Sequence, residues 1–225
     1  MIKVVLVDMD DTLLDFSEGA KYAMKRACFD AGIQYTEEMH SIFIPYNETL
    51  WQRLERGELT KKQLYSLRWT YIFNLLSING DGLEFEENFR RHISDSAAVI
   101  NGAEEMLAYL HEKYVVCIAS NSSFARVKTR LEKAGLDRFI DHIFTSEQAG
   151  ATKPNAAFFE YCFNQLPNLK KEEAVIIGDS LSADIKGGID YGISTVWYNA
   201  KKQAFSNEIL PKETITSLFQ IKNIL

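Results

Sequence analysis

The 225-residue sequence predicts a doubly wound α/β protein: a parallel sheet with helices on both faces and a helical domain inserted after the first strand. Short, continuous apolar runs occur near the N-terminus and again from about residue 99, separated by amphipathic segments. Continuous runs are typical of strands buried on both faces, and their alternation with helices indicates right-handed βαβ units. The stretch between residues 17 and 98 contains helical patterns and no convincing strand.

Five segments are predicted strands because they are short and rich in β-branched or aromatic residues. They are 4–8, 115–120, 142–146, 174–179 and 193–197, of which 142–146 carries the weakest signal. Helices are expected between them, and the pattern after Ser123 has a plausible C-terminal glycine at Gly135. These helical segments are 101–114, 123–136, 155–166 and 182–192. The last part, 200–225, is expected to contain a loop, a short strand and a terminal helix.

The inserted region has three helical patterns, at 17–32, 59–77 and 84–95. In the second pattern Thr60 is a candidate N-cap. Its apolar stripe is predicted to consist of Leu64, Leu67, Tyr71 and Leu75. A small core of its own is expected from Trp51, Trp69, Phe73 and Phe85. The predicted domains are therefore an α/β core of residues 1–16 and 99–225 and a helical domain of residues 17–98.

The composition is that of a water-soluble globular protein, with 46% hydrophobic and 25% charged residues. The net charge of −6 argues against sequence-independent binding of nucleic acid as a main role. The three cysteines are widely spaced and form no CxxC pair, which favours reduced thiols over a disulfide framework or a zinc site. The N-terminal segment is expected to be neither a signal peptide nor a membrane anchor, and no apolar stretch approaches the roughly 20 residues that a membrane helix needs. We therefore expect a cytoplasmic protein without a membrane partner, either a monomer or a homodimer.

Carboxylates lie at the ends of two of the predicted strands. Asp8 ends the first, at 4–8, with Asp10 two positions later, and Asp179 ends the run at 174–179. In an open parallel sheet, ligands bind beyond the carboxyl ends of the strands. Residues i and i+2 of an extended chain point to the same side, so Asp8 and Asp10 are able to face one group.

Ser120 and Asn121 end the second long run, and Lys153 lies in the loop that follows the weakest one. Carboxylates gathered at one edge repel one another unless they are protonated or bridged by a cation, and Mg²⁺ prefers oxygen ligands. Each feature alone has a simpler explanation, such as a solvated loop, a helix cap or a surface lysine. Together, at the ends of successive strands, they indicate a site for an anionic substrate.

The sequence resembles the haloacid dehalogenase-like (HAD) phosphohydrolases. Four motifs match in order: DMDDT at 8–12, ASN at 119–121, KP at 153–154 and GDSLSAD at 178–184. The resemblance covers the α/β portion and implies a Rossmann-like fold in which the helical insertion is a cap. The sequence departs from many members at Asp11, where they carry glycine.

The resemblance implies an Mg²⁺-dependent phosphomonoesterase. Asp8 would be the nucleophile that forms an aspartyl-phosphate, and Asp10 the general acid and then base. The metal would be held by the Asp8 carboxylate, the Asp10 main-chain carbonyl and Asp179. Asp184 would orient these ligands or pair with Lys153. The groups that would stabilise the phosphoryl oxygens are Ser120, Asn121 and Lys153.

Within this family the sequence looks most like pyrimidine 5′-nucleotidases, through stretches such as DMDDTLLDF and SEQAGATKP. The substrate would then be a small phosphate ester, a nucleoside monophosphate. Trp51 or Trp69 would stack on the base and Arg53 or Arg68 would contact its polar edges; alternatively, the tryptophans form the core of the helical domain.

Other functions remain open at this stage. They are a phosphatase for phosphoglycolate or a sugar phosphate, a hexose-phosphate mutase, a haloacid dehalogenase and a phosphate-binding regulatory protein. A dehalogenase is the weaker alternative because it needs no acid or base two positions after the nucleophile, whereas Asp10 is present. A regulatory protein would need the acidic pocket but no helical insertion.

Overall fold

The structure is a computed structural model, and it describes residues 1–204 and 208–225. The chain divides into two compact units, one of Met1–Asp15 with Ala97–Leu225 and one of Phe16–Ser96. These boundaries differ by one and two residues from the domain limits expected at 16 and 99. No helix within the described ranges is both long and apolar enough to cross a membrane.

The first unit is built on a parallel sheet with the strand order β3-β2-β1-β4-β5-β6. The described strands are β1 (Val4–Val7), β2 (Val115–Ser120), β3 (His142–Thr145), β4 (Ala174–Gly178), β5 (Ser194–Tyr198) and β6 (Glu213–Ile215). Each neighbouring pair is parallel, from β1 with β2 to β5 with β6. The predicted doubly wound α/β class is confirmed.

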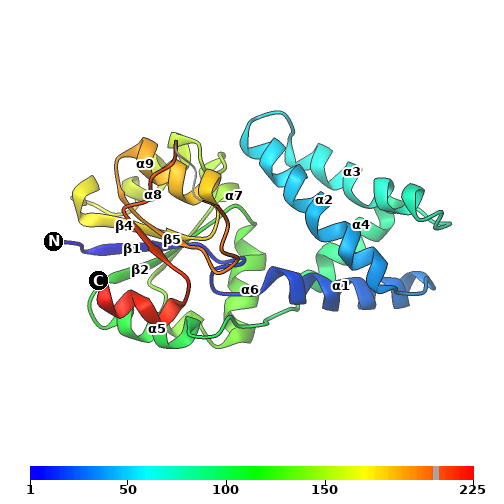
Figure 1. The fold of residues 1–225 in the computed structure, drawn as a ribbon, viewed down its shortest axis with the longest axis horizontal. Coiled ribbons are helices and arrows are strands. Elements are labelled where there is room, and N and C mark those ends of the chain that lie inside the picture. Colours follow the sequence, from blue (N-terminus) through cyan, green and yellow to red (C-terminus); the bar gives the residue numbers. More distant parts are fainter. Residues whose placement is uncertain (205–207) are drawn as a thin grey trace. The chain divides into compact units, whose positions relative to one another are not determined.

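Helices cover both faces of this sheet, and Figure 1 shows α5 on one face and α8 with α9 on the other. The α-helices of this unit are α5 (Ala103–His111), α6 (Phe124–Ala134), α7 (Ser146–Ala149), α8 (Ala156–Asn164) and α9 (Gly187–Tyr191). Short helical turns are η1 (Asp137–Phe139), η2 (Lys171–Glu173), η3 (Leu181–Lys186) and η4 (Leu218–Asn223). The expected terminal strand and helix correspond to β6 and η4, and part of the loop expected before them, 205–207, lies outside the described residues.

Alternation along β1 explains why its apolar run is continuous. Val5 and Val7 belong to one core cluster, which also contains residues of α5 and α6. Val4 and Leu6 belong to another, which contains Phe158 of α8. Because successive side chains of a strand point to opposite faces, a strand covered on both sides needs apolar residues at every position.

The second unit consists of four helices, α1 (Phe16–Ala31), α2 (Glu37–Glu55), α3 (Lys61–Leu75) and α4 (Gly82–Ile93). Its core combines aliphatic and aromatic residues and includes Trp69, Phe73 and Phe85, as expected. Trp51, by contrast, is half-buried in a smaller cluster around Leu50. Sequence patterns did not identify α2, whose N-cap is Thr36 and which contains Pro45.

The predicted apolar stripe of α3 is wrong. Leu64 is buried, but the other three members are exposed: Leu67 by 38%, Tyr71 by 45% and Leu75 by 53%. The buried face carries Arg68, Trp69, Ile72 and Phe73 in addition to Leu64. The helix begins as expected, with Thr60 and Gln63 forming a reciprocal cap.

Candidate active site

The predicted site residues of the first unit meet at the carboxyl ends of the central strands. Asp8 follows β1, Ser120 ends β2 and Asp179 follows β4, and these three strands are neighbours in the sheet. The Asp8 N–H donates to the Ile177 carbonyl at 2.9 Å, so the hydrogen bonding between β1 and β4 continues up to the site. Parallel strands end at the same edge, and this places residues far apart in the chain in one crevice.

Lys153 supplies the positive charge at the centre of the site. Its side chain is buried, with 1% of the residue exposed, although it lies in the loop between α7 and α8. The ammonium group donates to Asp8 Oδ1 at 2.7 Å, Asp184 Oδ1 at 2.6 Å and the Ala119 carbonyl at 2.5 Å. An ammonium has three N–H donors, so these bonds satisfy it completely.

Asn121 holds the main chain of Lys153 from the neighbouring strand end. Its amide nitrogen donates to the Lys153 carbonyl at 3.0 Å, and its amide oxygen accepts the Lys153 N–H at 2.8 Å. These two bonds make Asn121 a positioning residue in this structure.

Ser120 is buried, and its hydroxyl oxygen accepts the N–H of Ser122 at 3.1 Å. The O–H of Ser120 is therefore left as a donor.

Asp184 is placed in the site by a close approach of its helical turn to β4. The residue lies in η3, it is 1% exposed, and its Oδ2 accepts the Ser180 N–H at 3.1 Å. A Cβ atom at Gly178 would lie only 2.2 Å from Asp184 Oδ2. Gly178, the last residue of β4, is therefore required to have no side chain if Asp184 is to reach Lys153.

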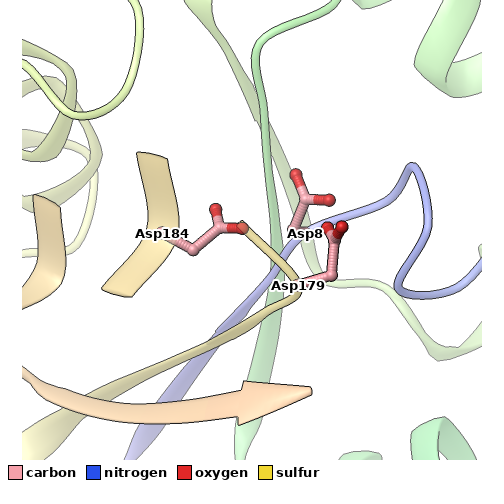
Figure 2. Close-up of side chains that lie close together, drawn as sticks. All are labelled: Asp8, Asp179 and Asp184. Carbon is pink, nitrogen blue, oxygen red and sulfur yellow. The ribbon is translucent and has the colours of Figure 1, made fainter. Parts of the chain in front are cut away.

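Three carboxylates lie close together at this edge, and Figure 2 shows them converging from separate segments. Oxygen atoms of Asp8, Asp179 and Asp184 all lie within 4.8 Å of one another. Asp179 is anchored through its main chain, whose carbonyl accepts the Trp197 indole N–H at 2.9 Å. Its carboxylate also accepts a long hydrogen bond of 3.5 Å from Thr12.

The cluster holds more negative charge than Lys153 neutralises. Burial, offset in part by Lys153, raises the pKa of Asp8 to about 7. Burial and the nearby charge of Asp8 raise the pKa of Asp179 well above its ordinary value. Burial alone would lower the pKa of Lys153, but the Asp184 and Asp8 carboxylates raise it, so the lysine stays protonated.

This donor set fits a hard divalent cation. Carboxylate oxygens are the ligands that such ions prefer, and a cation would stabilise the ionised forms of Asp8 and Asp179 against burial and mutual repulsion. The fit follows from the residues themselves: three neighbouring acids, of which the buried Asp8 and Asp184 pair with a single ammonium, that of Lys153.

Asp10 lies outside that cluster and contacts a residue that the sequence did not single out. Its Oδ1 accepts a bond of 2.5 Å from Nη1 of Arg130, which is on α6. Arg130 is 1% exposed. In the sequence, Arg130 stands out only because it shares a helix face with the apolar Val127 and Leu131. Helical spacing does not reveal that its partner lies 120 positions away.

Asp11, the departure from the family pattern, adopts a left-handed backbone with φ of 60°. Glycine reaches this region without a Cβ penalty, which explains why many members carry it there, and aspartate is one of the few other residues that tolerate it. The Asp11 carboxylate also accepts a hydrogen bond from Lys201 at 2.8 Å.

Two of the four residues predicted to contact the leaving group lie in the core of the second unit. Trp69 is fully buried and packs against Phe85 with 4.5 Å between the ring centroids. Arg68 is 3% exposed and pairs with Glu86. Burial thus removes Trp69 and Arg68 as candidate substrate contacts. Trp51 is half-buried and the Arg53 side chain is 40% exposed, so these two remain candidates.

A doubly wound sheet that gathers acids and a lysine at the carboxyl ends of its strands defines an α/β protein with a site at the edge where such sheets bind ligands. The sequence profile of the family described as "haloacid dehalogenase-like hydrolase" matches residues 2–192. The chain belongs to this family.

Several curated relatives align over most of the chain. The HAD-hydrolase YfnB of Bacillus subtilis is 32% identical over 223 residues, which are 99% of this chain and 95% of that protein. The pyrimidine 5′-nucleotidase PynA of Streptococcus pneumoniae is 31% identical and covers 88% of this chain and 84% of its own. The pyrimidine 5′-nucleotidase YjjG of Escherichia coli is 28% identical, with 98% and 96% covered.

Solved structures agree on the fold. The crystal structure of YfnB from Bacillus subtilis, bound to magnesium, matches with a TM-score of 0.95 and 32% identity, and it covers 100% of this chain and 98% of that chain. A dehalogenase structure matches with a TM-score of 0.77 at 18% identity and covers 100% and 97%. At that identity the dehalogenase shows the shared fold alone.

Proposed function

We propose that the protein is an Mg²⁺-dependent phosphomonoesterase that acts through an aspartyl-phosphate on Asp8. The observation that carries this proposal is the position of Lys153, whose ammonium bonds both Asp8 and Asp184 within the acidic cluster. A nucleophilic carboxylate that must approach a phosphate dianion needs compensating positive charge, and the lysine supplies part of it.

In the first step, a carboxylate oxygen of Asp8 forms a bond to phosphorus while the bond from phosphorus to the ester oxygen breaks. Asp10 gives its proton to the departing alkoxide. In the second step, Asp10 takes a proton from water, the water oxygen bonds to phosphorus, and the bond from Asp8 to phosphorus breaks. The Ser120 hydroxyl donates to the phosphoryl oxygens, and the positive charge of Lys153 stabilises their negative charge in both steps.

The metal would be held by the carboxylates of Asp8 and Asp179 and the main-chain carbonyl of Asp10, with Asp184 keeping Lys153 in place. When bound, Mg²⁺ supplies positive charge that offsets the negative charge on the phosphoryl oxygens. The magnesium in the crystal structure of YfnB supports this choice of ion.

We further propose pyrimidine nucleoside monophosphates as the substrates. This assignment is supported by two relatives named pyrimidine 5′-nucleotidase, which align over 88% and 98% of this chain. Trp51 and Arg53 on α2 are the remaining candidates for contacts with the base.

A second candidate is a phosphatase for a small sugar phosphate. The observation that favours it is a glyceraldehyde 3-phosphate phosphatase of Pyrococcus furiosus, which is 30% identical over 220 residues and covers 90% of this chain and 83% of its own. The two candidates share the chemistry at Asp8 and differ only in the leaving group.

The test is phosphate release from a panel of nucleoside monophosphates and sugar phosphates, with Mg²⁺ and with EDTA. We expect Mg²⁺-dependent release led by UMP, dUMP or dTMP, and its loss in Asp8→Asn. Asp190→Asn is the matched control because this exposed aspartate pairs with Lys186 on the surface. Release led by a sugar phosphate would replace the nucleotide assignment, and no release from any ester by folded protein would overturn the phosphatase proposal.

A further inference from the structure

A buried cation on α6 faces the predicted general acid. Arg130 has 1% of its side chain exposed, and its Nη1 lies 2.5 Å from Oδ1 of Asp10, whose side chain is 33% exposed. The two residues are 120 positions apart, so the contact is a product of the tertiary fold.

Packing alone does not account for an arginine at this position. The other buried residues of α6, Val127 and Leu131, are aliphatic and belong to the core cluster of the sheet. Burying a charge costs free energy, and replacing a buried ion pair by apolar residues of similar volume is often neutral or stabilising. A leucine or methionine would therefore serve the packing of α6 at position 130. What an apolar residue would not provide is a charged donor directed at Asp10.

We propose that Arg130 is a positioning residue for Asp10, which it holds by Oδ1 so that the proton transferred in the reaction is carried by Oδ2. This inference rests on the proposed function, in which Asp10 is the acid and base. The guanidinium group has five N–H donors and no acceptor, and it stays protonated in proteins. Oδ1 of Asp10 accepts a hydrogen bond from Arg130, so a proton on Oδ1 would compete with that bond. The transferred proton is therefore carried by Oδ2.

The proton balance of the two steps then involves one atom. As the ester bond to phosphorus breaks, the Oδ2–H bond of Asp10 breaks and the proton passes to the leaving oxygen. When water attacks the aspartyl-phosphate, its proton passes back to Oδ2. Arg130 exchanges no proton in either step. A planar donor group that fixes one carboxylate oxygen also limits rotation of the other, and correct orientation is worth large factors in rate.

The experiment compares two phosphate esters in wild type and Arg130→Met. One ester is p-nitrophenyl phosphate, whose acidic phenol departs without a proton. The other is the alkyl phosphate that wild type hydrolyses fastest. The ratio kcat/KM reports the first chemical step, so it isolates departure of the leaving group. We expect Arg130→Met to lower kcat/KM for the alkyl ester on the order of ten- to a hundredfold more than for the aryl ester.

The matched control is Arg138→Met, which removes an arginine–carboxylate contact of the same length, to Glu104, on the exposed surface. Arg138→Met should leave kcat/KM unchanged for both the alkyl and the aryl ester. Arg130→Lys keeps the charge and one donor, and it should recover part of the alkyl-ester activity. In an Asp10→Asn background, adding Arg130→Met should cost little further activity, because a positioning residue acts only through the residue that it positions.

Equal losses on both esters, or equal losses with and without Asp10, would overturn the role of Arg130 and leave only a structural contact. If Arg130→Met does not fold, Arg130→Lys alone decides: a loss confined to the alkyl ester supports the inference, and an equal loss refutes it. Failure of the proposed function is distinguishable, since wild type would then hydrolyse neither ester.

Discussion

The buried ion pair of the second unit offers a sharp test of whether Arg68 stabilises the helical unit or contacts substrate. The Arg68 guanidinium donates to Glu86 through Nε at 3.0 Å and Nη2 at 2.5 Å, and to the Asn47 amide oxygen through Nη1 at 2.7 Å. Both charged side chains are only 4% exposed. We predict that Arg68→Met destabilises the protein and leaves KM unchanged.

The magnitude follows from burial. The substitution removes the two hydrogen bonds that Arg68 donates to Glu86 and the one that it donates to Asn47. Breaking a buried ion pair typically costs about 3–5 kcal/mol. A change of 1 kcal/mol shifts the melting temperature of a chain of this length by roughly 2–4 °C. The melting temperature of Arg68→Met should therefore fall by roughly 6–20 °C.

The assay is thermal unfolding followed by tryptophan fluorescence, since Trp69 is fully buried in the same unit. Arg53→Met is the matched control: its side chain is 40% exposed and lies 3.4 Å from the exposed Glu58, so its removal should hardly move the midpoint. If Arg68→Met unfolds like wild type while its KM for the best substrate rises, then Arg68 contacts substrate and the structural assignment is refuted.

Three further outcomes are expected. Gly178→Ala should lower phosphate release at least about tenfold at saturating Mg²⁺, because its Cβ would lie 2.2 Å from Asp184 Oδ2 and displace that side chain; unchanged release would contradict the required close approach. Asp184→Asn should weaken Mg²⁺ affinity or activity by about 10–100-fold, measured by titrating the metal in the phosphate assay. In EDTA, the free energy of unfolding should fall as the pH rises from about 4 to about 7. Burial raises the pKa of Asp8 to about 7, so in this range the folded state binds more protons than the unfolded state. The rise in melting temperature on adding Mg²⁺ should accordingly be larger at pH 8 than at pH 5, and an equal rise would count against this reasoning.

Local patterns were sufficient for the sheet and its edge. The run at 115–120 is β2, and the weak run at 142–146 is β3 apart from its last residue. Because parallel strands share an edge, polar residues at the ends of successive strands had to come close together. Asp8, Lys153 and Asp179 were located in this way without knowledge of any contact.

The helical unit was less predictable because its helices carry apolar residues on more than one face. In α3 the stripe through Leu67 and Tyr71 has helical spacing, yet it is exposed, while the face with Arg68 and Trp69 is buried. A pattern based on hydrophobicity assigns arginine to the surface. Here its charge is compensated by Glu86 on α4, and that pairing depends on how the helices pack.

By itself, the sequence determined the α/β class, the identity of the acids and of the lysine, and the edge of the sheet at which they meet. These follow from local periodicity and from chain order. Only the tertiary structure decided which buried charges pair: Arg130 with Asp10, and Arg68 with Glu86. Such pairs form between distant segments, and their geometry depends on packing that no local pattern encodes.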